Sequence, residues 1–209
     1  NKNEYILYAL LKKDVEFPKE FNILDNKSFN RSKAKYKFFG FENDARKYKN
    51  HVTPIYYRNK NEYALSMNTT SGDRVILYRT SSNKNVEDLY YNLTKYARKP
   101  MKLGDNDKLY IPNININEQI EYNQLCNKKI KNSKIVISKA IDDIQFVLNN
   151  KGAQLRNEAV IEAVEMSLPI PGRGTVYDFS KPFVLYMVEK DKQQPYFAIK
   201  IKDTRFLVK

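Results

Sequence analysis

Residue types that carry enzymatic chemistry are scarce in this sequence. It contains one cysteine, Cys126, and one histidine, His51. A single cysteine cannot form an internal disulfide, and Cys126 belongs to no thiol or zinc motif. His51 lies in a connection rich in Lys and Asn, and it would have to act without a second histidine. We therefore expect no enzymatic activity, no metal and no cofactor.

The chain instead offers peptide bonds on which another protein could act. Residues 152–181 form a long connection that starts with a sequence tolerant of helix and becomes extended and turn-rich around Met166-Ser167-Leu168-Pro169. A connection of this length inside a compact domain is uncommon and usually functional. A short helix followed by an ordinary loop is the alternative interpretation.

Apolar strands are expected on both sides of this connection. Ile144, Phe146 and Leu148 alternate with other residues before it. After it, residues 183–188 and 196–201 are largely apolar and flank a polar turn, which predicts a terminal hairpin of core strands.

The rest of the chain predicts mixed strands and few helices. The run 5–11 is apolar and short, as in a strand buried on both faces, although a helix is also compatible with it. Further strands are expected at 38–41, 52–57, 75–78 and 109–116, the last with a change of phase at Pro112. The clearest helix is 86–97, with Asn85 as its N-cap and Pro100 as its stop.

Composition indicates a folded protein of 209 residues, which we interpret as one domain spanning 1–209. The formal net charge of +13 makes this a basic protein and makes heparin or another polyanion a candidate partner. The densest cluster comprises Lys128, Lys129, Lys131 and Lys134, but bases and acids are interleaved elsewhere. A solvated basic surface is therefore favoured over a dedicated patch, and no nucleic-acid module is recognisable.

Export is favoured by four glycosylation motifs, at Asn26, Asn30, Asn68 and Asn92, which suit a secreted or extracellular glycoprotein. The sequence lacks an apolar run of about 18 residues, so no membrane association is expected. Because the chain starts at Asn1 without Met or a signal sequence, we also expect a trimmed N-terminus.

A family resemblance becomes visible in the last third. From Ile144 the sequence runs IQFVLNNKGAQLRNEAVIEAVEMSLPIPGRGTVYDFSKPFVLYMVEKDKQQPYFAIKIKD. This run closely resembles the reactive-loop region of the serpin family: a main-sheet strand, a hinge at Lys151-Gly152, the loop, and Phe179-Ser180-Lys181-Pro182-Phe183 opening the terminal strands. Weaker similarity reaches back over 85–93, 109–116 and 5–21.

The resemblance implies an α+β fold of serpin-like mixed sheets with few helices. It also implies that the family's N-terminal helical half has no counterpart in this chain. The missing half would cover one face of the main sheet, and an uncovered apolar face is an association surface. A partner chain or a homodimer that completes the fold is therefore expected.

The resemblance further implies a protease-directed role for the connection. Met166-Ser167 would be the reactive bond, and Met166 suits the primary pocket of elastase-like or chymotrypsin-like serine proteases. Arg173 is an alternative cleavage point for trypsin-like enzymes. In such inhibitors the cleaved loop inserts as a new strand between two others.

The hinge departs from the inhibitory pattern, which is rich in alanine. It comprises Gly152, Ala153, Gln154, Leu155, Arg156, Asn157 and Glu158. If Ala153 faces inward, Asn157 does too, and burying it without partners costs about 1 to 3 kcal/mol. Three functions remain open: a protease inhibitor, a non-inhibitory serpin-like binding module, and a polyanion-binding structural protein.

Overall fold

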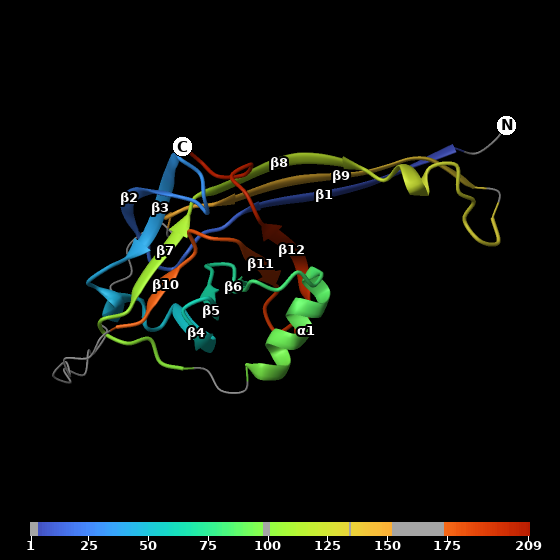
Figure 1. The fold of residues 1–209 in the computed structure, drawn as a ribbon. Helices are drawn as coiled ribbons and strands as arrows, with labels where there is room; N and C mark the ends of the chain where they lie inside the picture. Colours follow the sequence, from blue (N-terminus) through green and yellow to red (C-terminus); the bar gives the residue numbers. More distant parts are fainter. Residues whose placement is uncertain (1–3, 98–100, 134, 152–173) are drawn as a thin grey trace, which may run out of the picture. The chain divides into compact units, whose positions relative to one another are not determined.

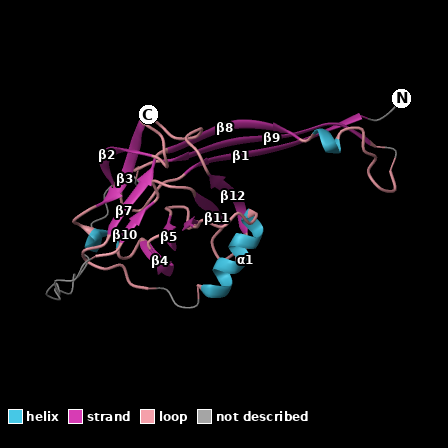
Figure 2. Cartoon of the chain, viewed as in Figure 1, coloured by secondary structure: helices cyan, strands magenta, loops and turns pink. Residues whose placement is uncertain are grey.

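The computed structural model describes residues 4–97, 101–133, 135–151 and 174–209. These residues form two compact units. Unit 1 comprises the described residues within 1–15 and 114–148, and unit 2 comprises those within 16–113 and 149–209. Strands dominate both units (Figure 2), and α1 (Val86–Tyr96) is the only α-helix in the described part of the chain, beside two short 3-10 turns.

Unit 1 is a three-stranded sheet in the order β1-β9-β8. Its strands are β1 (Glu4–Asp14), β8 (Ile114–Glu121) and β9 (Val136–Leu148), and a 3-10 turn, η2 (Asn123–Leu125), follows β8. β9 pairs in parallel with β1 and antiparallel with β8. The long strands lie side by side in Figure 1.

Unit 2 contains two sheets. One has the order β10-β7-β3-β2, formed by β2 (Asn22–Ser28), β3 (Lys35–Phe41), β7 (Lys108–Pro112) and β10 (Val176–Asp178). The other has the order β12-β11-β6-β5-β4, formed by β4 (Val52–Asn59), β5 (Glu62–Asn68), β6 (Arg74–Arg79), β11 (Phe183–Val188) and β12 (Pro195–Ile201). A 3-10 turn, η1 (Ala45–Tyr48), separates β3 from β4.

Helix α1 (Val86–Tyr96) covers the second of these sheets. The Asn85 side chain accepts a hydrogen bond from the Asp88 N–H at 2.7 Å, which is the predicted N-cap. Leu89 and Leu93 are buried against the sheet, and the Tyr90 and Tyr186 rings lie 4.9 Å apart. The predicted helix and its N-cap are thus confirmed, whereas Pro100 lies outside the described residues.

The terminal hairpin is also confirmed. β11 pairs antiparallel with β12, with Phe183 opposite Ile201, and every residue of β11 is buried. The strand at 5–11 is confirmed as part of β1, so the helical alternative is wrong.

Burial of this strand on both faces was the wrong expectation. Ile6 is 64% exposed, because the described residues of unit 1 form a single sheet layer with no second layer to cover a face of β1.

The predicted strand 109–116 is two strands in different sheets. β7 ends at Pro112, which cannot donate a ladder hydrogen bond, and β8 begins at Ile114 in unit 1. Three strands, β2, β5 and β10, were not predicted. β10 lies inside the connection predicted over 152–181, so that connection ends before Val176 and its bounds were wrong. β2 is polar and largely exposed, so it lacks the apolar alternation by which strands are recognised.

Candidate functional site

The residues predicted to form the reactive bond and its hinge lie outside the described part of the chain. They are Met166, Ser167, the alternative cleavage residue Arg173, and the hinge residues Gly152, Ala153, Gln154, Leu155, Arg156, Asn157 and Glu158. The structure describes the residues on both sides, 149–151 and 174–181, and these define how the segment 152–173 is attached.

The upstream attachment follows β9 directly. The carbonyls of Asn150 and Lys151 accept hydrogen bonds from the N–H groups of Phe21 and Phe17, at 3.0 and 3.1 Å. The Asn150 side chain donates to the carboxylate of Glu20 at 2.7 Å. Phe17 and Phe21 are buried with their rings 4.9 Å apart, so this turn is tied to a packed aromatic cluster.

The downstream attachment is built around Asp107, which is only 6% exposed. One carboxylate oxygen accepts the Gly104 N–H at 2.8 Å, and the other accepts the Thr175 N–H at 2.7 Å. The Thr175 carbonyl in turn accepts the N–H of Lys108 at 2.9 Å. A carboxylate that accepts two backbone N–H groups makes stronger bonds than a neutral acceptor would, so Asp107 fixes the start of β10.

Gly174 is required by this packing. A side-chain carbon at position 174 would overlap the carbonyl group of Asn106, so only glycine lets the two backbones approach this closely. Residue 174 is therefore fixed in close backbone contact with Asn106.

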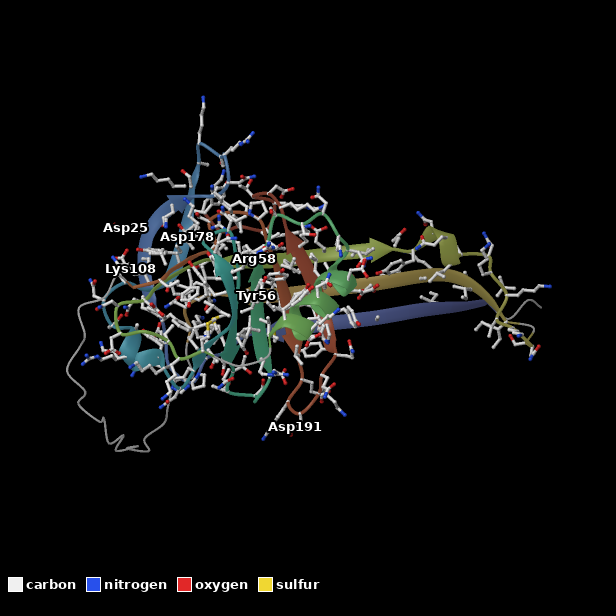
Figure 3. All side chains as sticks on the ribbon, turned by 60° about the horizontal axis from the view of Figure 1, so that its bottom comes forward. Asp25, Tyr56, Arg58, Lys108, Asp178 and Asp191 are labelled. Atoms are coloured by element: carbon white, nitrogen blue, oxygen red, sulfur yellow. The ribbon has the colours of Figure 1, made fainter. Side chains whose placement is uncertain are left out.

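β10 is held by polar side chains from other strands. Asp178 forms an ion pair with Lys27 of β2 at 3.0 Å, and the Lys27 ammonium lies 3.7 Å from the centre of the Tyr110 ring. Figure 3 shows Asp178 and Lys108, which come from the neighbouring strands β10 and β7. The Asp178 side chain also accepts the Ser180 N–H at 2.9 Å.

The backbone of Asp178 is bound by two further side chains. The Tyr63 hydroxyl accepts the Asp178 N–H at 2.6 Å and donates to the Asp178 carbonyl at 2.8 Å. Arg79 donates to the same carbonyl at 2.6 Å. Burial raises the pKa of Tyr63 to about 12, even though Arg79 acts in the opposite direction. The Tyr63 hydroxyl is therefore neutral near pH 7 and keeps both of its hydrogen bonds to Asp178 there.

Sequence reasoning missed Asp107, Lys27, Tyr63 and Arg79 as partners of the loop. The turn Gly104-Asp105-Asn106-Asp107 has the composition of a side-chain-capped turn and could have drawn attention to Asp107. Lys27 and Tyr63 reach β10 across 151 and 115 positions of the chain, and no local pattern records such contacts.

The remaining predicted site residues are distributed over the surface. Asn26, Asn30 and Asn68 are exposed, whereas Asn92 is half-buried on α1. Lys128, Lys129 and Lys131 are exposed in unit 1, and Lys134 lies outside the described residues.

The described residues contain no group of three or more His, Cys, Asp or Glu that could hold a metal ion. Cys126 is a half-buried free thiol, with its sulfur 3.8 Å from the Tyr122 carbonyl oxygen. No helix in the described ranges is long and apolar enough to cross a membrane.

No family model matches the sequence. The chain is 32% identical over 73 residues to alpha-1-antiproteinase from Mus caroli, a match that covers 35% of this chain and 16% of that protein.

Solved structures match over a much larger part of the chain. Mouse protein Z-dependent protease inhibitor matches with a TM-score of 0.64 at 10% identity, over 93% of this chain and 54% of that one. A serpin from the trematode Schistosoma haematobium gives 0.63 at 11% identity, over 95% and 56%. Human thyroxine-binding globulin gives 0.60 at 13% identity, over 90% and 53%.

The chain thus spans about half the length of the solved structures that it matches. The expected fold class is confirmed, with mixed sheets and one described helix arranged as in serpins. The chain is thus similar in sequence to an antiproteinase over 73 residues, and it shares the fold of several serpins over about half of their length, as expected for the C-terminal part of that fold.

Proposed function

We propose that this protein presents residues 152–173 to serine proteases as a reactive-centre loop, with Met166-Ser167 as the bond that the protease attacks. The observation that carries the proposal is the attachment of this segment at both ends. Residues 150 and 151 are bonded to Phe17 and Phe21, and Thr175 is bonded to Asp107. A substrate segment held at both ends loses less conformational entropy when a protease binds it.

The names of the relatives support the same class of partner. One is called an antiproteinase and another a protease inhibitor. Met166 has an unbranched apolar side chain, which suits the primary pocket of elastase-like or chymotrypsin-like enzymes.

Arg173 is the second choice as a cleavage point. A protease must bind the residues on both sides of the bond that it cuts, and Gly174 is packed against Asn106 while Thr175 is bonded to Asp107. Cleavage after Arg173 would require these contacts to open.

The strand pair β1 and β9 is the proposed place for loop insertion. These strands run parallel, with Glu4 opposite Val136 and Asp14 opposite Val147. A segment that leaves the end of β9 and folds back beside it runs antiparallel to both strands. Its insertion would replace one parallel pair by two antiparallel pairs, which are slightly more stable per residue.

The hinge nevertheless favours a substrate over a trap. Leu155 and Asn157 would turn inward with Ala153 if the loop inserted, and Asn157 would lose about 1 to 3 kcal/mol as an unpaired buried amide. Slow insertion gives the protease time to hydrolyse the acyl intermediate and leave. We therefore expect cleavage without lasting inhibition.

The test mixes the protein with an elastase-like and a chymotrypsin-like protease. We expect cleavage at Met166-Ser167 and no complex that survives denaturant on a gel. A stable covalent complex with either enzyme would contradict the substrate prediction. The melting temperature before and after cleavage is the second measurement, because a large rise on cleavage would reveal insertion.

One hinge variant and one reactive-bond variant sharpen this experiment. Leu155→Ala together with Asn157→Ala should raise the fraction of protease trapped, because the inward positions become small. Met166→Asp is the control for the site of attack, since both enzyme classes should stop cutting at residue 166 while the hinge is unchanged.

A second candidate function is a non-inhibitory binding module. One structural neighbour is thyroxine-binding globulin, solved in complex with its hormone, so the fold also occurs in a protein that binds a small molecule. Cleavage without trapping is compatible with this candidate, whereas a stable protease complex is not.

The remaining assignments are part of the same proposal. We propose one domain over 1–209, secretion, and glycans on the exposed residues Asn26, Asn30 and Asn68, with Asn92 as the half-buried fourth site. Pairing with a partner chain or a second copy is supported by exposed apolar side chains, such as Ile6 at 64% and Ile23 at 76%.

A further inference from the structure

A basic pocket lies in unit 2, at the ends of β6 and β12 and the start of β11. Its volume is about 450 Å³, within the range of small-ligand sites. Its basic side chains are Arg79, Lys181, Lys200 and Lys202. The other described residues that line it are Asn61, Pro182 and the turn 80–83, so none of the described lining residues is a carboxylate.

Arg79 is the central residue of this pocket, because it is a buried cation and no carboxylate in the described part of the chain forms an ion pair with it. It is 8% exposed, and its guanidinium donates to the Asp178 carbonyl at 2.6 Å and to the Asn61 side-chain oxygen at 3.2 Å. Both acceptors are neutral. The carboxylate of Asp178 is itself used by Lys27 and by the Ser180 N–H.

A buried cation is stabilised when it is paired, and leaving one with neutral acceptors alone costs free energy. The guanidinium has five N–H donors in a planar fork that matches an oxyanion. Two of them donate to neutral oxygens, and the guanidinium also interacts with the neutral Tyr63 side chain. None of these described partners is an anion, so donors remain for a ligand.

The lysines add further positive charge that an anion in the pocket would stabilise. Lys200 is half-buried and donates to the Ser82 carbonyl at 2.6 Å. Burial, and the neighbouring charge of Lys202, lower the pKa of Lys200 below its ordinary value. A nearby anion would stabilise the charged form of Lys200 and so act against both effects. The exposed Ser81 hydroxyl offers a further hydrogen-bond donor at the pocket.

We infer that this pocket binds a small organic ligand through a phosphate or sulfate group, with Arg79, Lys181, Lys200 and Lys202 as the anion-binding residues. The pocket is larger than an inorganic oxyanion needs. Pro182 and the alkyl parts of the lysine side chains supply apolar surface for the organic part of the ligand. The inference is independent of the protease-directed loop.

The first experiment measures binding of inorganic phosphate, inorganic sulfate and phenyl phosphate by calorimetry at constant ionic strength set with NaCl. We expect saturable binding that excess chloride does not abolish, with phenyl phosphate bound at least threefold more tightly than phosphate. Binding that disappears with added chloride would overturn the inference, because it would indicate diffuse charge alone.

Matched double variants separate the pocket from overall charge. Lys181→Gln with Lys202→Gln should weaken phenyl phosphate binding at least tenfold. Lys33→Gln with Lys35→Gln removes the same charge from exposed positions of unit 2 and should change it less than twofold. Equal losses in the two pairs would contradict the inference.

Asn83→Asp tests the pocket without disturbing Arg79. Asn83 is exposed and lines the pocket, so the variant supplies a built-in carboxylate with little change of shape. We expect a higher melting temperature in the absence of ligand and at least tenfold weaker phenyl phosphate binding. An unchanged affinity, or a lower melting temperature, would show that the cations need no anion.

Discussion

Asp107 holds the downstream end of the proposed reactive loop through both of its carboxylate oxygens. Asp107→Asn keeps the size of the side chain but replaces one acceptor oxygen by an NH₂ group, which would face a backbone N–H. We expect the free energy of unfolding to fall by about 1 to 3 kcal/mol, as for a buried hydrogen bond that is left unmade. Urea unfolding measures this loss.

The same variant should also expose Arg173 to trypsin. Freeing the Thr175 N–H loosens the segment after residue 173, so cleavage at this bond should become faster, as followed by mass spectrometry. Asp25→Asn is the matched control, because Asp25 is exposed and makes no described contact. If both variants behaved like the parent, Asp107 would not anchor the loop.

The raised pKa of Tyr63 predicts that the protein loses stability at alkaline pH. Its folded-state pKa is raised to about 12 from an ordinary value of 10.0, so folding favours the neutral phenol. The associated stability is fully present below about pH 10 and is lost as the pH rises through about 12. Tyr63→Phe cannot ionise, although it lacks the two hydrogen bonds to Asp178.

The difference in unfolding free energy between parent and Tyr63→Phe should therefore be about 1 kcal/mol or more at pH 8 and should shrink between pH 10 and 12. Urea unfolding at pH 8, 10 and 11.5 follows this trend. A constant difference across the series would mean that Tyr63 ionises alike in the folded and unfolded states.

At the scale of elements, the segment between β9 and β10 is expected to be the most sensitive to proteolysis. Its composition is rich in Pro and Gly toward the end, and its sequence has no continuous hydrophobic pattern. Brief digestion with elastase should cut first within residues 159–175. First cuts within β11 or β12, identified by mass spectrometry, would contradict the reactive-loop assignment.

The elements themselves were predicted to different degrees for physical reasons. Helix α1 and the hairpin of β11 and β12 were predictable because capping, apolar period and turn all lie within a few residues of each other. β2 was missed because it is polar, and its pairing with β3 stabilises it as a strand. The change of phase at Pro112 was predicted from the sequence. That β7 and β8 belong to different sheets was not predicted, because it depends on pairing with distant strands.

At the scale of the whole molecule, the net charge of +13 predicts polyanion binding that is spread over the surface. Affinity for heparin should fall steeply with added salt, and Lys129→Ala should change it little, because Lys128 and Lys131 are also exposed nearby. Heparin chromatography at several salt concentrations measures both effects. A large loss from Lys129→Ala alone, at moderate ionic strength, would instead identify a specific site.

The sequence by itself determined the family resemblance, the order of strands around the loop, the helix and its cap, and the candidate bond Met166-Ser167. These features depend on local composition, on spacing, or on a continuous run of residues such as the one from Ile144. The tertiary structure alone decided which distant groups meet. Asp107, Lys27 and Tyr63 hold β10, and the buried Arg79 lines one pocket together with three lysines. Such contacts join positions far apart in the chain, and only the folded backbone sets their distances.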